Sequence, residues 1–215
     1  MAKAWEKSAH GRSGVGCPAC HTDNHDGAMA AHARRNTTCL TGCHERERSS
    51  YTLSKHGVIA TLETERMDFS LPLKEGNQRS PSCAYCHLHD QEHDAGRGIL
   101  PLDPSGLTPG PNQAEHIEAR VAPCRDCHSP RFVDTWFSTG DRTLEIGRMK
   151  LREAEGVVSR FDSPQARTIL RQMKERHLKN MRLGVGHASP DDLWWHGQAA
   201  LDGDLARLKS LMSAP

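Results

Sequence analysis

Four short stretches decide the fold of this chain, and they read Cys17-Pro-Ala-Cys20-His21, Cys39-Leu-Thr-Gly-Cys43-His44, Cys83-Ala-Tyr-Cys86-His87 and Cys124-Arg-Asp-Cys127-His128. They contain all eight cysteines of the chain, and a histidine directly follows the second cysteine of every pair. C-x-x-C-H is the attachment signature of haem c, because two thiols at this spacing reach the two vinyl groups on one porphyrin edge. The next residue points an imidazole at the iron. We therefore expect four covalently bound haem c groups, each with an iron, whose proximal ligands are His21, His44, His87 and His128.

The second motif departs from this pattern, because three residues instead of two separate Cys39 from Cys43. One inserted residue can bulge out of the loop, so we keep this motif as a haem site. Paired cysteines can also form zinc ribbons, although zinc does not require a histidine after every second cysteine. Redox-active dithiols and disulfides are further alternatives, but a bond within C-x-x-C staples no distant parts of a chain.

The composition also indicates a cofactor core. Hydrophobic residues make up 36% of the 215 residues and aromatic residues 5%, which leaves few large side chains to bury. The 28 basic and 27 acidic residues give a net charge of +1, so nothing favours nucleic acid or an anionic membrane as a partner. No run of about 18 apolar residues predicts a membrane span. The first seven residues lack the apolar core of an export signal.

Ten of the 14 histidines remain after the four proximal ligands are assigned. Electron-transfer haems have two axial ligands from the protein, whereas catalytic haems keep one position open. The local sequence favours five histidines as distal ligands, namely His10, His25, His56, His93 and His187. We expect partly exposed helical histidines at His116, His177 and His196, and solvated ones at His32 and His89.

The fold class predicted from these patterns is mostly α. Residues 1–137 read as a four-haem region of short helices and loops wrapped on porphyrin, and residues 138–215 as a C-terminal helical region. Residues 101–111 form a Pro/Gly-rich connection. Three antiparallel helices are expected in the second region, one from Asp141 to Phe161, one after Ser163-Pro164 and one after Ser189-Pro190. The predicted apolar stripe of the first helix carries Leu144, Leu151, Val158 and Phe161. One side of the second carries Ile169, Met173, His177 and Met181, and one face of the third carries Leu193, His196, Ala200, Leu205, Leu208 and Met212.

The order of motifs resembles the C-terminal haem-binding half of the octahaem hydroxylamine oxidoreductase-like cytochromes c. The second motif is followed by Tyr51-Thr-Leu-Ser-Lys-His56-Gly57, the third by His93, and the fourth continues as Ser129-Pro-Arg131-Phe132. A helical tail with Gly186-His187-Ala-Ser-Pro190 comes last, so the resemblance covers most of residues 10–205. It implies distal ligands at His25, His56, His93 and His187, an electron wire of packed haems, a periplasmic or otherwise extracytoplasmic location, and trimers.

The departures from this family bear on function. The family's catalytic haem belongs to a motif upstream of the matched stretch, and this chain has no fifth motif. The tail also has Trp195 or a neighbour where the hydroxylamine-oxidising members have a cross-linking tyrosine. The resemblance thus implies half of an octahaem unit, which is a split-gene subunit whose partner chain carries the remaining haems, a fragment, or a reduced descendant. Redox partner proteins are expected as well.

Two functions follow. The first is an electron-transfer subunit of a nitrogen-oxide redox system. The alternative is a haem enzyme that oxidises hydroxylamine or reduces nitrite or hydroxylamine, with its active haem in this chain or in a partner.

Overall fold

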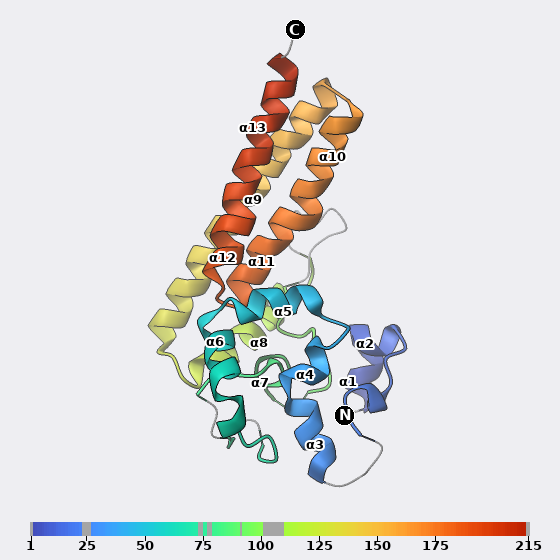
Figure 1. Ribbon diagram of the computed structural model, residues 1–215, viewed down its shortest axis with the longest axis vertical. Helices are drawn as coiled ribbons and strands as arrows, with labels where there is room; N and C mark the ends of the chain where they lie inside the picture. The colour runs from blue at the N-terminus through green and yellow to red at the C-terminus, as the bar shows by residue number, and fades with distance from the viewer. Residues whose placement is uncertain are drawn as a thin grey trace. The chain divides into compact units, whose positions relative to one another are not determined.

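Figure 1 shows a computed structural model of the chain, which describes residues 2–22, 27–72, 75–76, 79–90, 92–100 and 110–213. Every regular element in these ranges is helical, so the predicted mostly α fold is confirmed. The chain forms two compact units. We call Met1–Thr52 with His56–Val133 the motif unit, and Leu53–Lys55 with Asp134–Pro215 the helical unit. Most of the connection predicted over residues 101–111 lies outside the described residues.

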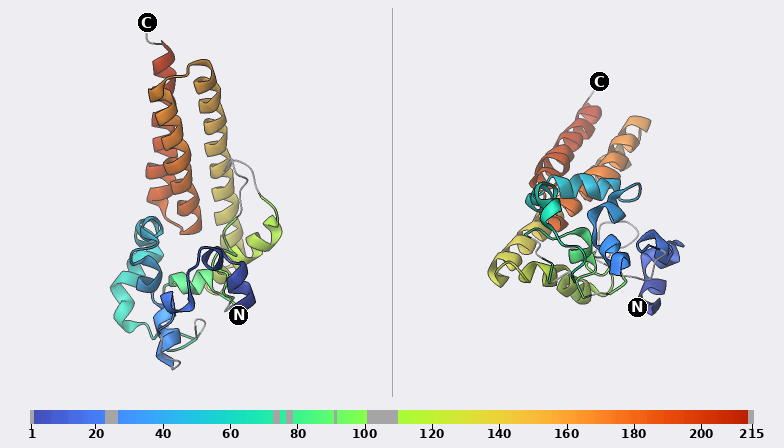
Figure 2. Two further views of the ribbon diagram at one scale, coloured as in Figure 1. Left: turned by 90° about the vertical axis from the view of Figure 1, so that its right-hand side faces the viewer. Right: turned by 60° about the horizontal axis from the view of Figure 1, so that its bottom comes forward.

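The motif unit consists of short helices joined by loops, as Figure 2 shows. Side-chain caps start several of them: the hydroxyl of Ser8 accepts a hydrogen bond from the Gly11 amide, and that of Ser82 accepts one from the Tyr85 amide. The helices are α1 (Ala2–Lys7), α2 (Ala9–Arg12), α3 (Gly27–Arg34), α4 (Asn36–Leu40), α5 (Glu45–Thr52), α6 (Lys55–Glu63), α7 (Cys83–His87) and α8 (Gln113–Arg125), with 3₁₀ turns at Cys17–Ala19 and Thr64–Arg66.

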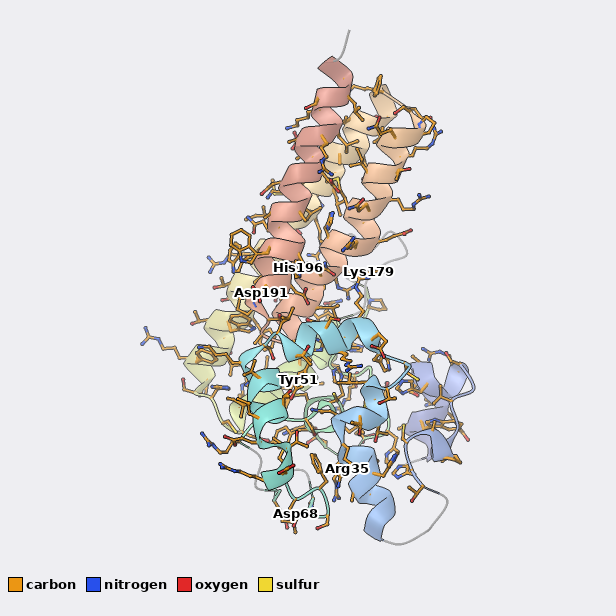
Figure 3. The ribbon with its side chains drawn as sticks, viewed as in Figure 1. Arg35, Tyr51, Asp68, Lys179, Asp191 and His196 are labelled. Carbon is orange, nitrogen blue, oxygen red and sulfur yellow. The ribbon has the colours of Figure 1, made fainter. Side chains whose placement is uncertain are left out.

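The buried side chains of the motif unit are few and mostly small. The large ones include Tyr51, labelled in Figure 3, whose hydroxyl donates to the Pro81 carbonyl at 2.7 Å. The buried apolar residues described in this unit are Tyr51, Ala60, Phe69, Ala84, Tyr85, Val121 and Val133, beside the buried serines Ser8, Ser50, Ser80 and Ser82. Such an interior buries little apolar surface for its length, so a large apolar ligand would add much of its stability.

The helical unit is built from three long helical segments that lie side by side in Figures 1 and 2. Ser163 caps the second segment as predicted, because its hydroxyl accepts from the Ala166 amide and Pro164 takes the first helical position. The elements are α9 (Pro130–Arg160), α10 (Pro164–Gln172), a π-helical turn (Met173–His177), α11 (Leu178–Gly186), α12 (Pro190–Leu193), a second π-helical turn (Trp194–Ala199) and α13 (Ala200–Ser213).

The first of these helices starts earlier than predicted. We expected it to begin at Asp141, but α9 begins at Pro130. The reason is the pair Ser129-Pro130, which repeats the start signal of Ser163-Pro164: the Ser129 hydroxyl accepts from the Phe132 amide at 3.3 Å. The Ser-Pro pair directly follows the fourth motif, so α9 begins two residues after His128.

The interior of the helical unit is tightly packed apolar side chains. Leu151, Met173, Met181, Leu201 and Leu208 are fully buried. A glycine permits one close contact between two of its helices. A Cβ atom at Gly140 would lie 2.6 Å from the Cγ1 of Val185, so α9 and α11 approach each other closely at this point.

Two of the predicted apolar-face positions of the helical unit are exposed, and the face that carries His196 is shifted. His196, labelled in Figure 3, is exposed, and Phe161 and Met212 are 39% and 42% exposed. The π-helical turn Trp194–Ala199 explains His196, because a π turn adds a residue and shifts the face that a regular 3.6-residue period would bury. Gly197 is buried in place of His196. Phe161 and Met212 lie just beyond or at the ends of their helices, where the bundle covers less of each helix.

Candidate haem-attachment sites

One helical turn presents each regular motif. In the first motif the His21 amide donates to the Cys17 carbonyl at 2.9 Å, and in the fourth the His128 amide donates to the Cys124 carbonyl at 2.9 Å. The third motif is the whole of α7, Cys83–His87. Residues three and four apart on a helical turn share one face. Both thiols and the imidazole of a motif are thereby presented on the same side of the backbone.

The second motif absorbs its extra residue in a turn. α4 ends at Leu40, and Gly42 then adopts φ +78°, a left-handed conformation that glycine reaches without strain. The Gly42 amide donates to the side chain of Glu45 at 3.3 Å, which fixes the turn before His44. Cys39 therefore sits on a helix and Cys43 after a bend, a geometry consistent with a bulged attachment loop.

Consecutive motifs are neighbours in space. Burial raises the pKa of the Cys20 thiol, and the charges of Cys39 and Cys43 in the second motif raise it further. The thiol of Cys83 in the third motif hydrogen bonds to that of Cys39, which raises the pKa of Cys83 and lowers that of Cys39. The attachment edges of motifs one, two and three thus adjoin in sequence order.

The third and fourth motifs adjoin in the same way. Desolvation raises the pKa of the Cys86 thiol, and the nearby charges of Cys124, Asp126 and Cys127 contribute further to the shift. All three of these residues belong to the fourth motif.

Three motif histidines each lie beside a histidine that sequence analysis named as a distal ligand. The ring centroids of His10 and His44 are 5.8 Å apart, those of His21 and His93 6.2 Å, and those of His56 and His128 6.1 Å. A metal–imidazole nitrogen bond is about 2.0–2.1 Å long, so two imidazoles on opposite sides of one metal ion have centroids roughly 6 Å apart. The three separations fit one iron between each pair.

His87 of the third motif has the hydrogen bonding of a metal ligand. Its Nδ1 lies 2.9 Å from the Ala95 carbonyl, which requires Nδ1–H as the donor and leaves Nε2 free to bind iron. Burial lowers the pKa of His87, and the neighbouring His44 and His10 contribute in the same direction. The third motif therefore lies next to the histidine pair of the second.

The structure does not test two of the predicted distal ligands. His25 lies outside the described residues. His187 follows α11 as its C-terminal cap in the helical unit. Their roles as ligands stay predictions.

Two histidines that we expected to be solvated are structural partners of the motifs. The His89 side chain is only 8% exposed, and its Nε2 lies 2.7 Å from the Asp126 carboxylate of the fourth motif. The Nδ1 of half-buried His32 lies 3.0 Å from the Cys20 carbonyl of the first motif. Sequence spacing gave no signal for these contacts, which join segments 37 and 12 residues apart.

His177 and His196 have partners within the helical unit. His177 is buried, contrary to the partly exposed state expected of it as a candidate ligand, and its Nε2 lies 3.0 Å from Asp204. The exposed His196 contacts Asp192 at 3.1 Å. Both pairs lie within the helical unit.

A family described as "Seven times multi-haem cytochrome CxxCH" matches residues 10–167. The chain belongs to this multi-haem cytochrome family. It is 26% identical, over 207 aligned residues, to a probable nitrite reductase–hydroxylamine oxidoreductase fusion protein of Kuenenia stuttgartiensis. That alignment covers 74% of this chain and 24% of the relative, so this cytochrome spans about a quarter of the relative's length.

A solved structure has the same fold. A chain of a reducing HAO-like protein complex from Kuenenia stuttgartiensis superposes with a TM-score of 0.73 at 21% identity, over 95% of this chain and 61% of that one. HAO denotes hydroxylamine oxidoreductase. The cytochrome is thus a multihaem protein related to HAO-like proteins.

Membership of this family favours haem attachment over the zinc-ribbon and redox-dithiol alternatives for the cysteine pairs. This cytochrome binds haem c, with its iron, through covalent bonds to cysteine. The motif residues fit the group, because each turn presents its thiols and histidine together and three histidine pairs have the spacing of bis-imidazole ligation. Multihaem c-type cytochromes are typically extracytoplasmic. None of the helices in the described ranges is both long enough and apolar enough to cross a membrane.

Proposed function

We propose that this cytochrome binds four haems, one at each motif, and transfers electrons within a nitrogen-oxide redox system like that of hydroxylamine oxidoreductase. The observation that carries the proposal is the set of three histidine pairs with centroids 5.8–6.2 Å apart. An iron with two protein ligands changes its coordination little between oxidation states and leaves no position for substrate, which suits electron transfer.

The axial ligands follow from these pairs. The iron of the first haem would be bound by His21 and His93, that of the second by His44 and His10, and that of the fourth by His128 and His56. His87 would be the proximal ligand of the third haem, and the predicted ligands still unassigned, His25 and His187, are its candidate partners. The eight motif cysteines would form the thioethers.

When bound, the haems supply one-electron redox chemistry. The positions of the motifs in the folded chain determine the order in which the haems would lie. Cysteines of motifs one and two, two and three, and three and four are neighbours, so the four haems would follow one another in sequence order. The four-haem region would be residues 1–137, and residues 138–215 the helical region.

The setting of this cytochrome is also a proposal. The structure with the same fold comes from a complex named for two proteins, which supports a second chain that carries further haems. We propose a periplasmic or other extracytoplasmic location, redox partner proteins, and an oligomer, with a trimer implied by the family resemblance.

One experiment tests the proposal and the catalytic alternative together. Holoprotein from a cytochrome-c-maturing host is weighed intact and assayed as the pyridine haemochrome, and its oxidised spectrum is recorded with and without nitrite, cyanide and carbon monoxide. Four haems with low-spin irons inert to these ligands support electron transfer. Fewer haems contradict the tetrahaem assignment, and a high-spin iron that binds the added ligands supports the catalytic alternative, which the name of the fusion relative also favours.

A further inference from the structure

A hydrogen-bonded cluster joins the third and fourth motifs at the residues between their cysteines. Tyr85 precedes Cys86, and its hydroxyl donates to the Oδ2 atom of Asp126, which precedes Cys127, at 2.8 Å. The same Oδ2 atom lies 2.7 Å from the Nε2 atom of His89. The rings of Tyr85 and His89 lie 5.9 Å apart between centroids. We call Tyr85, Asp126 and His89 the bridging cluster.

The bridging cluster is shielded from solvent on the side of the third motif. Tyr85 is 9% exposed, the His89 side chain 8% and the Asp126 side chain 31%. Burial raises the pKa of Tyr85, and the Asp126 carboxylate raises it further. Because Tyr85 and His89 shield one side of the Asp126 carboxylate, its charge is screened less on that side than it would be in open water.

The position of the carboxylate is what gives it a function. Asp126 lies between Cys124 and Cys127 in sequence, and its charge also reaches Cys86 of the third motif. A negative charge close to two haem edges favours the oxidised, more positive state of both irons. Charge, hydrogen bonding and exposure around a haem are the means by which a protein sets its reduction potential.

We propose that the bridging cluster is a positioning site that locks the third and fourth haem-attachment loops together, and that its Asp126 carboxylate lowers the reduction potentials of both haems. The inference rests on the proposed attachment of haem at these two motifs. Within the cluster, Tyr85 and His89 hold the carboxylate in place and Asp126 supplies the charge.

Two nearly isosteric variants separate charge from structure. Asp126→Asn keeps an oxygen that accepts from the Tyr85 hydroxyl but removes the charge, so two of the haem potentials rise. Tyr85→Phe keeps the charge but removes a donor that partly compensates it, so the same two potentials fall. Potential shifts of opposite sign in the two variants indicate a charge effect, because loosening of the attachment loops would shift the haem potentials of both variants in the same direction.

The measurement is a spectroelectrochemical titration of the holoprotein at fixed pH and ionic strength, with individual haems resolved by EPR. Glu118→Gln is the matched control, because Glu118 lies on α8, the helix whose C-cap is Asp126, has a side chain that is 70% exposed, and pairs with Arg125. The haem potentials of Glu118→Gln should stay at the wild-type values. Asp126→Glu, which restores the charge, brings both potentials back towards wild type.

Three results overturn the inference. They are unchanged potentials in Asp126→Asn, equal shifts of all haems, and shifts of the same sign in Asp126→Asn and Tyr85→Phe. Peptide masses of the wild-type protein are measured first. If the third or fourth motif carries no haem, the tetrahaem proposal and this inference fall together, whereas haem at both motifs with unmoved potentials removes only the inference.

Discussion

His56 is the residue at which ligation can be tested most directly. Its ring centroid lies 6.1 Å from that of His128, and burial lowers its pKa, which favours the neutral imidazole that metals bind. His56→Ala should convert one iron from low to high spin and let it bind carbon monoxide, as read by EPR and optical spectroscopy. His196→Ala, which removes an exposed histidine of the helical unit, is the control and leaves the spectrum unchanged. An unaltered spectrum in His56→Ala would remove it from the ligand set.

Tyr51 gives a prediction for stability and its pH dependence. Its hydroxyl donates to the Pro81 carbonyl at 2.7 Å, so Tyr51→Phe should lower the free energy of unfolding by about 1 kcal/mol at neutral pH. Burial also raises the pKa of Tyr51 to about 12. The unfolded state therefore ionises first, and this contribution is complete below about pH 10 and is lost as the pH rises towards 12.

The measurement for Tyr51 is denaturant unfolding of the holoprotein from pH 7 to pH 12. Wild type should lose stability in the alkaline window, and Tyr51→Phe should lose less there. Equal alkaline slopes in the two proteins would contradict the assignment of this proton to Tyr51.

At the scale of elements, two glycines of α9 should respond to alanine in opposite directions. A Cβ atom at Gly140 would lie 2.6 Å from Val185 on α11, so Gly140→Ala forces two packed helices apart and should destabilise by about 1–3 kcal/mol. A Cβ atom at Gly156 would meet nothing within 4 Å. Gly156→Ala should therefore stabilise the helix by up to about 1 kcal/mol. Thermal unfolding measures both, and a destabilised Gly156→Ala together with a neutral Gly140→Ala would show that the α9–α11 crossing is wrong.

The elements also show what the sequence could predict. Ser163-Pro164 predicts its helix start because the signal is local, and Ser129-Pro130 carries the same signal directly after the fourth motif. The π-helical turn Trp194–Ala199 has no such signal, because packing against neighbouring helices selects the inserted residue. His196 is exposed for this reason, whereas Leu205 and Leu208 beyond the turn are buried as predicted.

At the scale of the whole molecule, residue spacing in the sequence predicts the haem-attachment motifs, whereas only the folded structure shows which histidine lies beside each motif histidine. The C-x-x-C-H pattern, together with its one-residue-longer variant at Cys39–His44, predicts the eight attachment cysteines and four proximal histidines. The neighbours of His44, His21 and His128 come from distant segments, so sequence analysis could name candidates but could not pair them. The bridge from His89 to Asp126 was missed for the same reason.

The two units should depend on haem to different degrees. The motif unit buries mainly small side chains among its described residues, whereas the helical unit has a continuous core that includes Leu151, Met181 and Leu208. Hydrophobic burial is the dominant favourable contribution to folding. Without haem, only the helical unit therefore buries enough apolar surface to stay folded. Apoprotein with alanine at all eight motif cysteines should then exchange its amides quickly over residues 2–133 and remain protected over much of residues 134–213.

Hydrogen exchange read by mass spectrometry, with holoprotein as the reference, makes this comparison segment by segment. Protection of α9 beyond residue 134 and of α13 should be similar in the two forms, while protection of α5, α7 and α8 should disappear without haem. Equal protection of the motif unit in both forms would show that its polypeptide folds unaided, and the porphyrins would then not be the core that its sparse apolar side chains indicate.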